Sequence, residues 1–330
     1  MMKNILVAGG AGYIGSHAVV QLLDQGYSVV VADNLSTGHL WAVDQRAKFM
    51  EGDIRDAAFM DRVFSEQKID AVMQFAADIV VAESEQNPLK YYNNNVYGTV
   101  ALLQAMLKHD VKNIVFSSTA AVYGDTEVVP VTEEVKVNPI SPYGKTKCFV
   151  EQILEDCRKA YGFNYCVFRY FNVAGAHEKY AIGQAVKHNT ALIPIILEVA
   201  AEERESIGVF GNDYNTKDGT GVRDFIHVVD LVDAHILGLN QLEKGESGIF
   251  NLGNGQGFTV MEMIEAARAV TGHPVPAVIS PRRDGDIAVS IASSEKAKTI
   301  LGWTPEYTDV KRIIETAWKW KQRMKRCIEF

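Results

Sequence analysis

The chain opens with a strand, a glycine-rich turn, a helix and a second strand within its first 33 residues. KNILVAG (3–9) is an apolar run typical of a buried strand, and GYIGSHAVVQLLDQG (12–26) has the apolar spacing of a helix that Gly26 closes. SVVVAD (28–33) predicts another buried strand. Two consecutive strands joined through one helix lie parallel. This opening unit therefore predicts a parallel sheet with helices packed against it.

The same alternation continues to about residue 175. Further buried strands are predicted at AVMQFAA (71–77), KNIVFSSTAAVYG (112–124) and NYCVFRYFNVAG (164–175), and helices at 88–110 and 141–160. Near-continuous apolar strands that alternate with helices are typical of a parallel sheet covered on both faces. We therefore expect the α/β class, with a doubly wound, Rossmann-type parallel sheet.

The pattern changes from about residue 176. Long polar loops at 176–190 and 211–224 surround an apolar helix at 191–203. Loops of that length inside a compact enzyme are usually binding segments or lids. This part of the chain therefore predicts a substrate-binding region.

Two later segments point back to the first sheet. A helix is predicted at 228–244, and the strand-like GIFNLG (248–253) is expected to rejoin the sheet. We expect a Rossmann domain over 1–175, rejoined by segments around 224–255, and a smaller, interleaved C-terminal α/β substrate domain over most of 176–330.

Three glycines, Gly9, Gly12 and Gly15, have GxxGxxG spacing directly after the first strand and open the first helix. Tight-turn packing alone also favours glycine, but residues without Cβ let a helix N-terminus approach a pyrophosphate. Asp33 ends the second strand, where a carboxylate accepts hydrogen bonds from an adenosine ribose and repels a 2′-phosphate. The motif therefore predicts NAD rather than NADP. Asp53 in GDIRD is either an adenine contact or an ordinary turn aspartate.

Tyr143 and Lys147 lie four positions apart in SPYGKTK (141–147) and share one face of the predicted helix. A surface helix with a solvated lysine gives the same spacing. Beside a nicotinamide, however, the ammonium and the cationic ring both favour the phenolate, whose pKa is ordinarily about 10. Tyr143 is then a candidate general base, and Lys147 its partner and a ligand of the nicotinamide ribose. Thr119, beside Ser118, either offers a hydroxyl to the reacting oxygen or caps the strand end.

Charge and cysteine usage exclude several classes of protein. A formal charge of -8 and a pI near 5.6 argue against a general nucleic-acid or anionic-membrane surface. No apolar run reaches about 18 residues, and the first residues do not read as a signal peptide, so we expect a cytoplasmic protein. The four cysteines, Cys148, Cys157, Cys166 and Cys327, form no CxxC pair, and no HExxH occurs. We expect no metal site.

Together these motifs resemble the extended short-chain dehydrogenase/reductases, and within them the UDP-glucose 4-epimerase family. GGAGYIGS and SPYGKTK mark the superfamily, whereas NDYNTKDGTGVRDFIHV (212–228) is narrower and typical of the epimerases. Matching stretches run almost from end to end. The resemblance implies bound NAD. The NAD site that it implies comprises Gly9, Gly12, Tyr13, Ile14, Gly15, Asp33, Asn34, Leu35, Ser36, Thr37, Gly38, Asp53, Ile54, Phe75, Ala76, Ala77, Asn94, Thr119, Tyr143, Lys147 and Phe171.

The resemblance also implies a site for a UDP-hexose. Arginine pairs bidentately with a diphosphate, which agrees with two of the implied residues. The implied set is Thr119, Tyr143, Asn172, Leu192, Val209, Phe210, Arg223, Arg283, Asp286 and Ser290. Some family members have a bulky tyrosine at the Ser290 position, near the sugar C2 substituent, so serine is expected to leave room for an N-acetyl group. Ile79 stands where many members have lysine, which leaves Lys147 as the main cationic partner.

The activity that the resemblance implies is reversible 4-epimerisation of UDP-glucose and UDP-galactose, through a transient 4-keto sugar, in galactose metabolism. It also implies a homodimer in which helices at about 88–110 and 141–160 pair with their copies. One alternative is a nucleotide-sugar 4,6-dehydratase, but dehydratases resemble one another in carrying Asp-Glu where this chain has Ala120 and Ala121. The other is an NAD-sensing binding protein without turnover.

Overall fold

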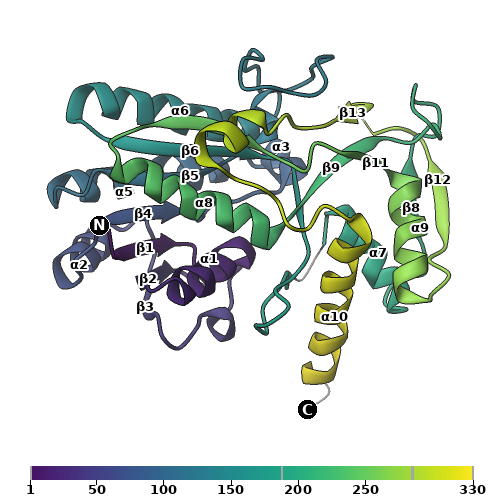
Figure 1. Ribbon diagram of the computed structural model, residues 1–330, viewed down its shortest axis with the longest axis horizontal. Coiled ribbons are helices and arrows are strands. Elements are labelled where there is room, and N and C mark those ends of the chain that lie inside the picture. Colours follow the sequence, from purple (N-terminus) through teal and green to yellow (C-terminus); the bar gives the residue numbers. More distant parts are fainter. Residues whose placement is uncertain (1, 187–188, 284–285, 329–330) are drawn as a thin grey trace.

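The computed structural model describes residues 2–186, 189–283 and 286–328, with side chains up to residue 325. Within these residues the centre is a seven-stranded parallel sheet, in the order β10-β6-β5-β4-β1-β2-β3 (Figure 1). Its strands are β1 (Asn4–Ala8), β2 (Ser28–Asp33), β3 (Lys48–Glu51), β4 (Ala71–Gln74), β5 (Asn113–Thr119), β6 (Asn164–Tyr170) and β10 (Gly248–Leu252). The predicted parallel sheet is confirmed.

Helices cover both faces of this sheet, which explains why its strands are apolar along their whole length. α1 (Tyr13–Asp24) and α8 (Val228–Glu243) share one apolar core with the sheet. α2 (Ala57–Glu66), α5 (Gly98–Lys108) and α6 (Pro142–Tyr161) share the core on the other face. The doubly wound arrangement expected from the sequence is therefore present.

The helix predicted over 88–110 is composite. α4 (Pro88–Tyr91) runs without a break into the π-helical turn η2 (Tyr92–Tyr97) and then into α5. Inside η2, the Asn95 amide donates to the Thr146 hydroxyl of α6 at 3.1 Å, and a local π turn can direct one side chain inward in this way. Short elements complete this half: η1 (Leu40–Ala42), α3 (Val81–Gln86) and η3 (Ala120–Val122).

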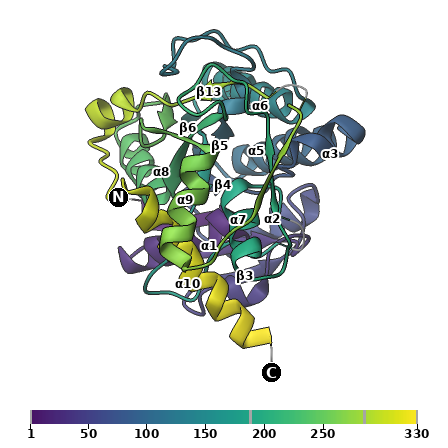
Figure 2. The same ribbon diagram turned by 90° about the vertical axis from the view of Figure 1, so that its right-hand side faces the viewer.

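The rest of the chain forms a second lobe, at the right of Figure 1 and in front in Figure 2. A small sheet contains β7 (Asn172–Ala174), β9 (Val222–His227), β11 (Gly257–Thr259) and β13 (Val289–Ser290), and β8 (Ile207–Phe210) pairs with β12 (Ala277–Ser280). α7 (Leu192–Ala200), α9 (Val260–Thr271) and α10 (Val310–Ile328) pack around a core of their own. η4 (Ala297–Leu301) packs back on α8.

The chain passes between the two lobes at the ends of β6 and β10. The segment predicted as one strand over 164–175 divides, because β6 ends in the large sheet while β7 pairs with β9 in the second lobe. Phe171 lies between them. After α8, β10 returns to pair parallel with β6, as expected of GIFNLG. The chain therefore crosses from one lobe to the other and back beside the carboxyl ends of the large sheet.

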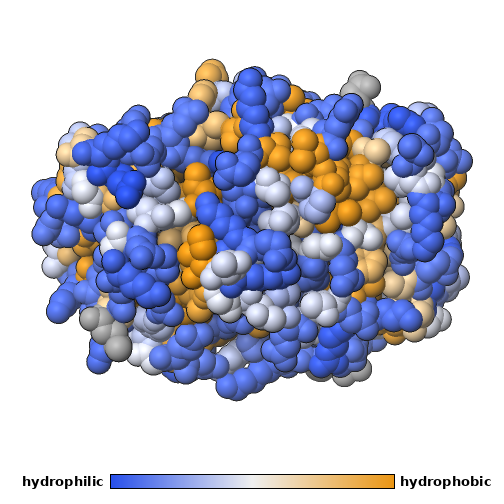
Figure 3. Space-filling view, turned by 45° about the horizontal axis from the view of Figure 1, so that its top comes forward, coloured by the Kyte–Doolittle hydropathy of each residue, from blue (hydrophilic) through white to orange (hydrophobic). Residues whose placement is uncertain are grey.

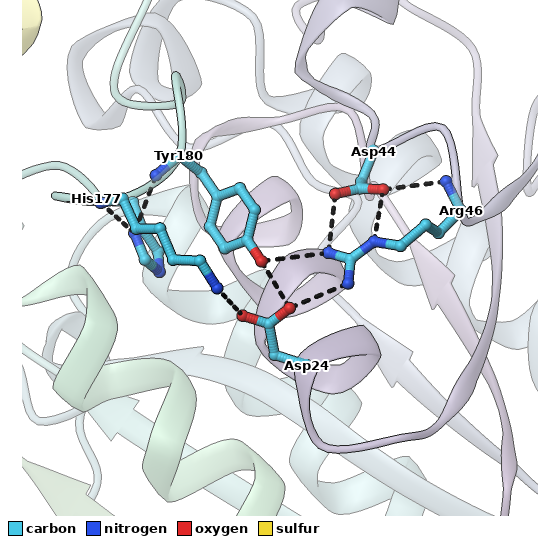
Figure 4. Close-up of polar contacts among 6 residues, drawn as sticks. Asp24, Asp44, Arg46, His177 and Tyr180 are labelled. Carbon is cyan, nitrogen blue, oxygen red and sulfur yellow. Dashed lines mark hydrogen bonds and ion pairs between the residues drawn. The ribbon is translucent and has the colours of Figure 1, made fainter.

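The segment after β7, residues 176–186, lies across α1, and we call it the strap. The Tyr180 hydroxyl donates to Asp24 at 2.5 Å, and the Arg46 guanidinium donates to Asp24 and Asp44, both at 2.9 Å (Figure 4). His177 Nδ1 accepts the backbone N–H of Tyr180 at 3.3 Å. Hydrogen bonding from Tyr180 lowers the pKa of Asp24 to about 2. The strap is thus tied to the C-terminal end of α1.

The outer surface is largely polar on the face that Figure 3 shows. Apolar side chains gather in limited areas of this face. None of the helices in the described part of the chain has both the length and the apolar character needed to span a membrane. Cys148, Cys157 and Cys166 are free thiols, and the side chain of Cys327 lies outside the described residues.

Candidate active site

Thr119 and Tyr143 meet at the carboxyl end of β5. Thr119 is the last residue of that strand, and Tyr143 lies in the first turn of α6, which Ser141 caps by accepting the N–H of Gly144 at 3.1 Å. Burial raises the pKa of Tyr143 to about 12, while its hydrogen bond with Thr119 acts in the opposite direction. The sequence predicted a lowered pKa beside a bound nicotinamide. In the protein without that ring, desolvation of the phenolate outweighs the hydrogen bond with Thr119.

Lys147 lies one helical turn beyond Tyr143 and is 4% exposed. Its ammonium donates to the carbonyl oxygen of Ser117 at 2.9 Å and lies 4.9 Å from the centre of the Phe116 ring. Burial lowers the pKa of Lys147 to about 8, and the charge of Glu151 raises it. The lysine thus carries a proton at neutral pH and loses it under mildly alkaline conditions.

The glycine-rich turn forms a narrow cradle beside Thr119, Tyr143 and Lys147, which we call the trio. Gly9 has φ +82°, and a Cβ there would lie 2.6 Å from the backbone nitrogen of Ala76. A Cβ on Gly15 would lie 2.1 Å from the carbonyl oxygen of Gly9. Gly12 caps α1 without a side-chain hydrogen bond, so the N–H groups of Tyr13 and Ile14 face an open turn. This is the geometry that an anionic group requires at a helix N-terminus.

Asp33 ends β2 at the rim of the cradle. Its carboxylate accepts the backbone N–H of Ala11 at 2.9 Å and of Leu35 at 2.8 Å. Burial raises the pKa of Asp33, and these two bonds lower it. Each carboxylate oxygen has a lone pair beyond those bonds, so Asp33 can accept from vicinal ribose hydroxyls.

The loop after Asp33 and the end of β3 form a second rim. Asn34 donates to Asp53 at 2.9 Å, and Arg55 binds the same carboxylate at 2.6 Å. Hydrogen bonding from Arg55 lowers the pKa of Asp53. Ser36, Thr37 and Gly38 complete the loop, and a Cβ on Gly38 would lie 2.8 Å from the carbonyl carbon of Ala11. Asp53 is therefore a charged, oriented group, and it also accepts the backbone N–H of Arg55 at 2.9 Å, as a turn aspartate does.

The opposite wall comes from the end of β4. The N–H groups of Phe75 and Ala76 donate to the carbonyl oxygen of Ala8, at 2.8 and 3.0 Å, which holds this segment and the following Ala77 against the glycine turn. Ile54 is buried against Gly98, and Asn94 is half-buried in η2. Most of the predicted cofactor residues thus follow the carboxyl ends of β1, β2, β3 and β4, as expected in an open parallel sheet, whereas Asn94 comes from η2.

A cavity of about 790 Å³ lies between the two lobes, next to the trio. Ala121 and Ser141, which line it, are each two residues from Thr119 and Tyr143. Six residues predicted at the substrate site also line it: Asn172, Leu192, Phe210, Arg223, Arg283 and Asp286. Val209 is buried in the core of the second lobe and turns away from the cavity. Ile79, at the mouth, presents an apolar side chain.

Positive charge gathers at the far end of this cavity. Burial lowers the pKa of Arg223, and its guanidinium lies 3.8 Å from Asp286. Arg283 donates to the same carboxylate at 2.9 Å and lies over the Phe210 ring at 4.4 Å. Two arginines beside one aspartate leave an excess of positive charge, which suits an anionic ligand.

The comparisons with known proteins agree with this geometry. Residues 5–253 match the NAD dependent epimerase/dehydratase family. The chain belongs to that family. It is 53% identical over 317 residues to a UDP-glucose 4-epimerase of Halalkalibacterium halodurans, covering 96% of this chain and 95% of the relative. A crystal structure of a UDP-glucose 4-epimerase superposes with a TM-score of 0.96 at 53% identity, covering 98% of each chain. The Bifidobacterium longum UDP-glucose 4-epimerase, solved in complex with NAD+ and UDP, gives 0.93 at 41%, covering 97% of this chain and 98% of that one.

The cradle of this epimerase/dehydratase fits a dinucleotide. The positions that a Cβ would block are glycines, the helix N-terminus is uncapped, and a buried carboxylate stands at the ribose position. Tyr13 also donates its hydroxyl to the carbonyl oxygen of Gly175 at 2.6 Å. The first turn of α1 is therefore bonded directly to the crossing between the lobes.

A side pocket of about 130 Å³ adjoins the main cavity of this epimerase/dehydratase. Ser290 and Phe171 line it, together with Tyr123 and Val289. Ala121, Gly124 and Ile287 line both spaces. Phe171 thus lies at the side pocket and packs on Val131 and Cys148, rather than in the dinucleotide cradle.

Two groups in this epimerase/dehydratase were not identified from the sequence. The buried Tyr214 hydroxyl lines the main cavity and has no hydrogen-bond partner among the described residues. Its signal was its place inside the narrow NDYNTKDGTGVRD motif. The second group is the buried pair of Glu151 and Arg169, joined at 2.5 Å. No local motif marks that pair.

Proposed function

We propose that this chain interconverts UDP-glucose and UDP-galactose by inverting C4 of the hexose with bound NAD. The observation that carries the proposal is that Thr119 and Tyr143 meet at the end of β5, one helical turn from Lys147 and two residues from the lining of a cavity with two arginines. A hydride step requires a base for the substrate hydroxyl, and this trio supplies one at the junction of the two sites.

Tyr143 takes the proton of the sugar 4-hydroxyl and later returns it. Thr119, which shares a hydrogen bond with Tyr143, orients that hydroxyl toward the phenol oxygen. Lys147 is held by Ser117 at the end of the same strand and stabilises the phenolate that forms. When bound, NAD supplies the acceptor and donor of the C4 hydride and a positive charge that favours the phenolate.

The chain's own residues bind the two ligands and shield them from solvent. The uncapped N-terminus of α1 and Asp33 bind the pyrophosphate and adenosine ribose of NAD. Arg223 and Arg283 bind the diphosphate of the sugar nucleotide, and Asn172, fixed by its bond to the Asp224 carbonyl at 2.8 Å, contacts it nearer the sugar. The roomy cavity between these poles lets the oxidised sugar turn over before its reduction.

The alternatives are not favoured. A 4,6-dehydratase needs extra acid and base groups after Thr119, where this chain has Ala120 and Ala121 at η3. An NAD-sensing protein without turnover has no need of the Tyr143 and Lys147 pair.

Incubation with UDP-galactose tests the proposal. We expect UDP-glucose as product, no consumption of an external oxidant, and NAD released from the purified protein on denaturation. Protein that carries no NAD and leaves UDP-galactose unchanged contradicts it. A 6-deoxy-4-keto product would instead reinstate the dehydratase.

The side pocket supports a wider choice of sugar. Because Ser290 is small and leaves about 130 Å³ open beside the main cavity, an acetamide at C2 has space as the hexose turns. The enzyme is therefore also proposed to act on UDP-N-acetylglucosamine and UDP-N-acetylgalactosamine.

The proposal includes a homodimer and a cytoplasmic location. The adjoining segments α4, η2 and α6 expose the apolar side chains of Leu89, Tyr97, Phe149 and Tyr161. Two copies of this face can form a four-helix interface.

The described cysteines are free thiols, as in the reducing cytoplasm. The domain division is proposed at residue 175, where the strap begins. Sedimentation that detects only monomer contradicts the dimer.

A further inference from the structure

Glu151 continues the face of α6 that carries Tyr143 and Lys147, since it follows them by eight and four residues. It is 6% exposed, and Arg169 of β6, 4% exposed, faces it from the sheet. The Arg169 guanidinium donates to both carboxylate oxygens, from Nε at 3.1 and 3.2 Å and from Nη2 at 2.5 Å. A bidentate pair this deeply buried has a fixed geometry.

The pair is bonded to the segments on both sides of Thr119. The Ser118 hydroxyl, one residue before Thr119, donates to Glu151. The Arg169 guanidinium donates to the Tyr123 hydroxyl at 3.0 Å, and that hydroxyl donates to Asn251 of β10 at 2.6 Å. One buried network therefore holds the end of β5, the turn η3 that follows it and the returning strand.

The charges around Lys147 are few. Glu151 is the opposite charge that acts on it, against the effect of burial. Strand β5 offers it the Phe116 ring and the Ser117 carbonyl oxygen, neither of which titrates. On α6, β6 and the turn after η3, the other titratable or charged groups of this region are Tyr143, Cys148, Arg169, Tyr170 and Tyr123. The elements α3, α4 and η2 also pack on α6, and they carry Glu83, Glu85, Lys90, Tyr91, Tyr92 and Tyr97.

We propose that Glu151 and Arg169 are a positioning pair for the catalytic trio. Glu151 keeps Lys147 in its ammonium form inside a dry site and, through Ser118, fixes the strand end that presents Thr119. Arg169 balances Glu151, so that the three charges sum to the single positive charge that acts on Tyr143. The kinetic part of this inference rests on the proposed epimerisation.

A merely structural pair makes a different prediction. Replacing a buried ion pair with neutral side chains is often tolerated or even stabilising, and removing one partner costs stability. In that case the melting temperature would change, but the pH at which Lys147 loses its proton would not. The test must therefore follow the proton on Lys147.

Four NAD-loaded variants provide that test: Glu151→Gln, Arg169→Met, the double variant, and Glu155→Gln as a matched control one turn further along α6. In Glu151→Gln we expect the alkaline limb of kcat/KM for UDP-galactose to move down by at least about one pH unit, as the loss of a neighbouring opposite charge requires. The double variant should lie between Glu151→Gln and the unchanged enzyme, because the repelling guanidinium is also gone. Glu155→Gln should show no shift.

A second measurement needs no substrate. The pH dependence of unfolding, taken as the difference between each protein and the same protein with Lys147→Met, reports the proton on Lys147 alone. In the Glu151→Gln background this difference should begin to rise at lower pH than in the unchanged protein. It separates the two hypotheses, since a chain that leaves UDP-galactose untouched fails the proposed function but still gives this titration.

Unshifted titrations in both measurements overturn the proposal, whatever happens to the melting temperature. If Glu151→Gln does not fold, the double variant decides, because it removes both charges together. Its alkaline limb must still lie below that of the unchanged enzyme, and an unchanged limb means that the pair is structural only.

Discussion

The Lys147 ammonium donates a hydrogen bond of 2.9 Å to the carbonyl oxygen of Ser117, thirty residues earlier in the chain. Two residues further along the same strand, Thr119 bonds with Tyr143. The end of β5 therefore positions both Tyr143 and Lys147, and the packing of α6 against β5 sets their separation. Replacing either side chain should thus alter chemistry more than fold.

Tyr143→Phe should lower kcat by about 10²- to 10⁴-fold, because the phenol oxygen that moves the substrate proton is gone. Bound NAD should be retained, since the cradle is untouched. Initial rates with UDP-galactose and the NAD content of the purified protein measure the two effects. Tyr161→Phe, at the exposed end of the same helix, is the control. An unchanged rate in Tyr143→Phe removes this residue from the mechanism.

The pH profile of kcat/KM should rise from acid pH and fall again above about 8. In the NAD-loaded enzyme the Lys147 ammonium and the cationic ring favour the phenolate, so the rise follows from deprotonation of Tyr143 at a pH below the pKa of Lys147, about 8, and the fall from deprotonation of Lys147. Lys147→Met should lose most activity and the alkaline limb with it. Lys145→Met, an exposed neighbour, should keep the full profile. A profile that stays flat to pH 10 would exclude Lys147 as the group responsible.

Lys147 should also make stability depend on pH. Its pKa is about 8 when folded and 10.5 when unfolded, so between these values the unfolded chain binds more protons and folding becomes more favourable as pH rises. The gain over the whole window is about 3 kcal/mol. Urea unfolding of the unchanged protein and of Lys147→Met, at pH values from 7 to about 10.5, measures it. A constant difference between the two would contradict the assignment.

Ser290→Tyr should separate the substrates. A tyrosine fills the side pocket and clashes with an acetamide, so turnover of UDP-N-acetylgalactosamine should fall by about tenfold or more, while UDP-galactose loses little. Product analysis with each sugar measures the split, and Ser290→Ala should leave both activities in place. Equal losses for the two sugars, or no N-acetylated activity in the unchanged enzyme, would show that this pocket is not the gate.

Tyr180→Phe should loosen the strap. The lost hydrogen bond to Asp24 is exposed, so the free energy of unfolding should fall by less than about 1 kcal/mol. Limited proteolysis within the strap, residues 176–186, should nevertheless become faster, because this segment opens locally before the rest unfolds. The pKa of Asp24, about 2, predicts that the strap holds above pH 4 and loosens as pH falls toward 2. Cleavage as slow as in Tyr161→Phe would argue against this anchoring role.

The nucleotide-binding half was accessible from sequence because its signals are local. Residues Asn4 to Asp33 form a strand, a turn, a helix and a second strand, and each of these elements shows its own apolar spacing or ends at a glycine or other turn residue. The helix over 88–110 was predicted as one element because its apolar spacing runs through η2. A π turn changes the backbone by one residue without changing the composition.

The substrate lobe was less accessible because its contacts are distant in sequence. β13 pairs with β9 across more than sixty residues, and it is only two residues long, too short to show a period. The raised pKa of Tyr143 in the protein without NAD was not expected from the sequence, since burial, which raises it, depends on tertiary packing. No local sequence pattern identifies the pair of Glu151 and Arg169. Arg169 becomes buried only because β5 and α6 pack beside β6, and this packing cannot be read from the residues around it.

The bond from Tyr13 to Gly175 has a consequence for timing. It joins the turn that faces the dinucleotide to the crossing between the lobes, so we expect release of the dinucleotide to require that the lobes also separate. Epimerisation returns NAD to its starting form, and no turnover requires that separation. We therefore expect two well-separated exchange rates, a fast one for the sugar nucleotide and a slow one for the cofactor. A single cofactor molecule should then stay with one protein molecule for much of its lifetime.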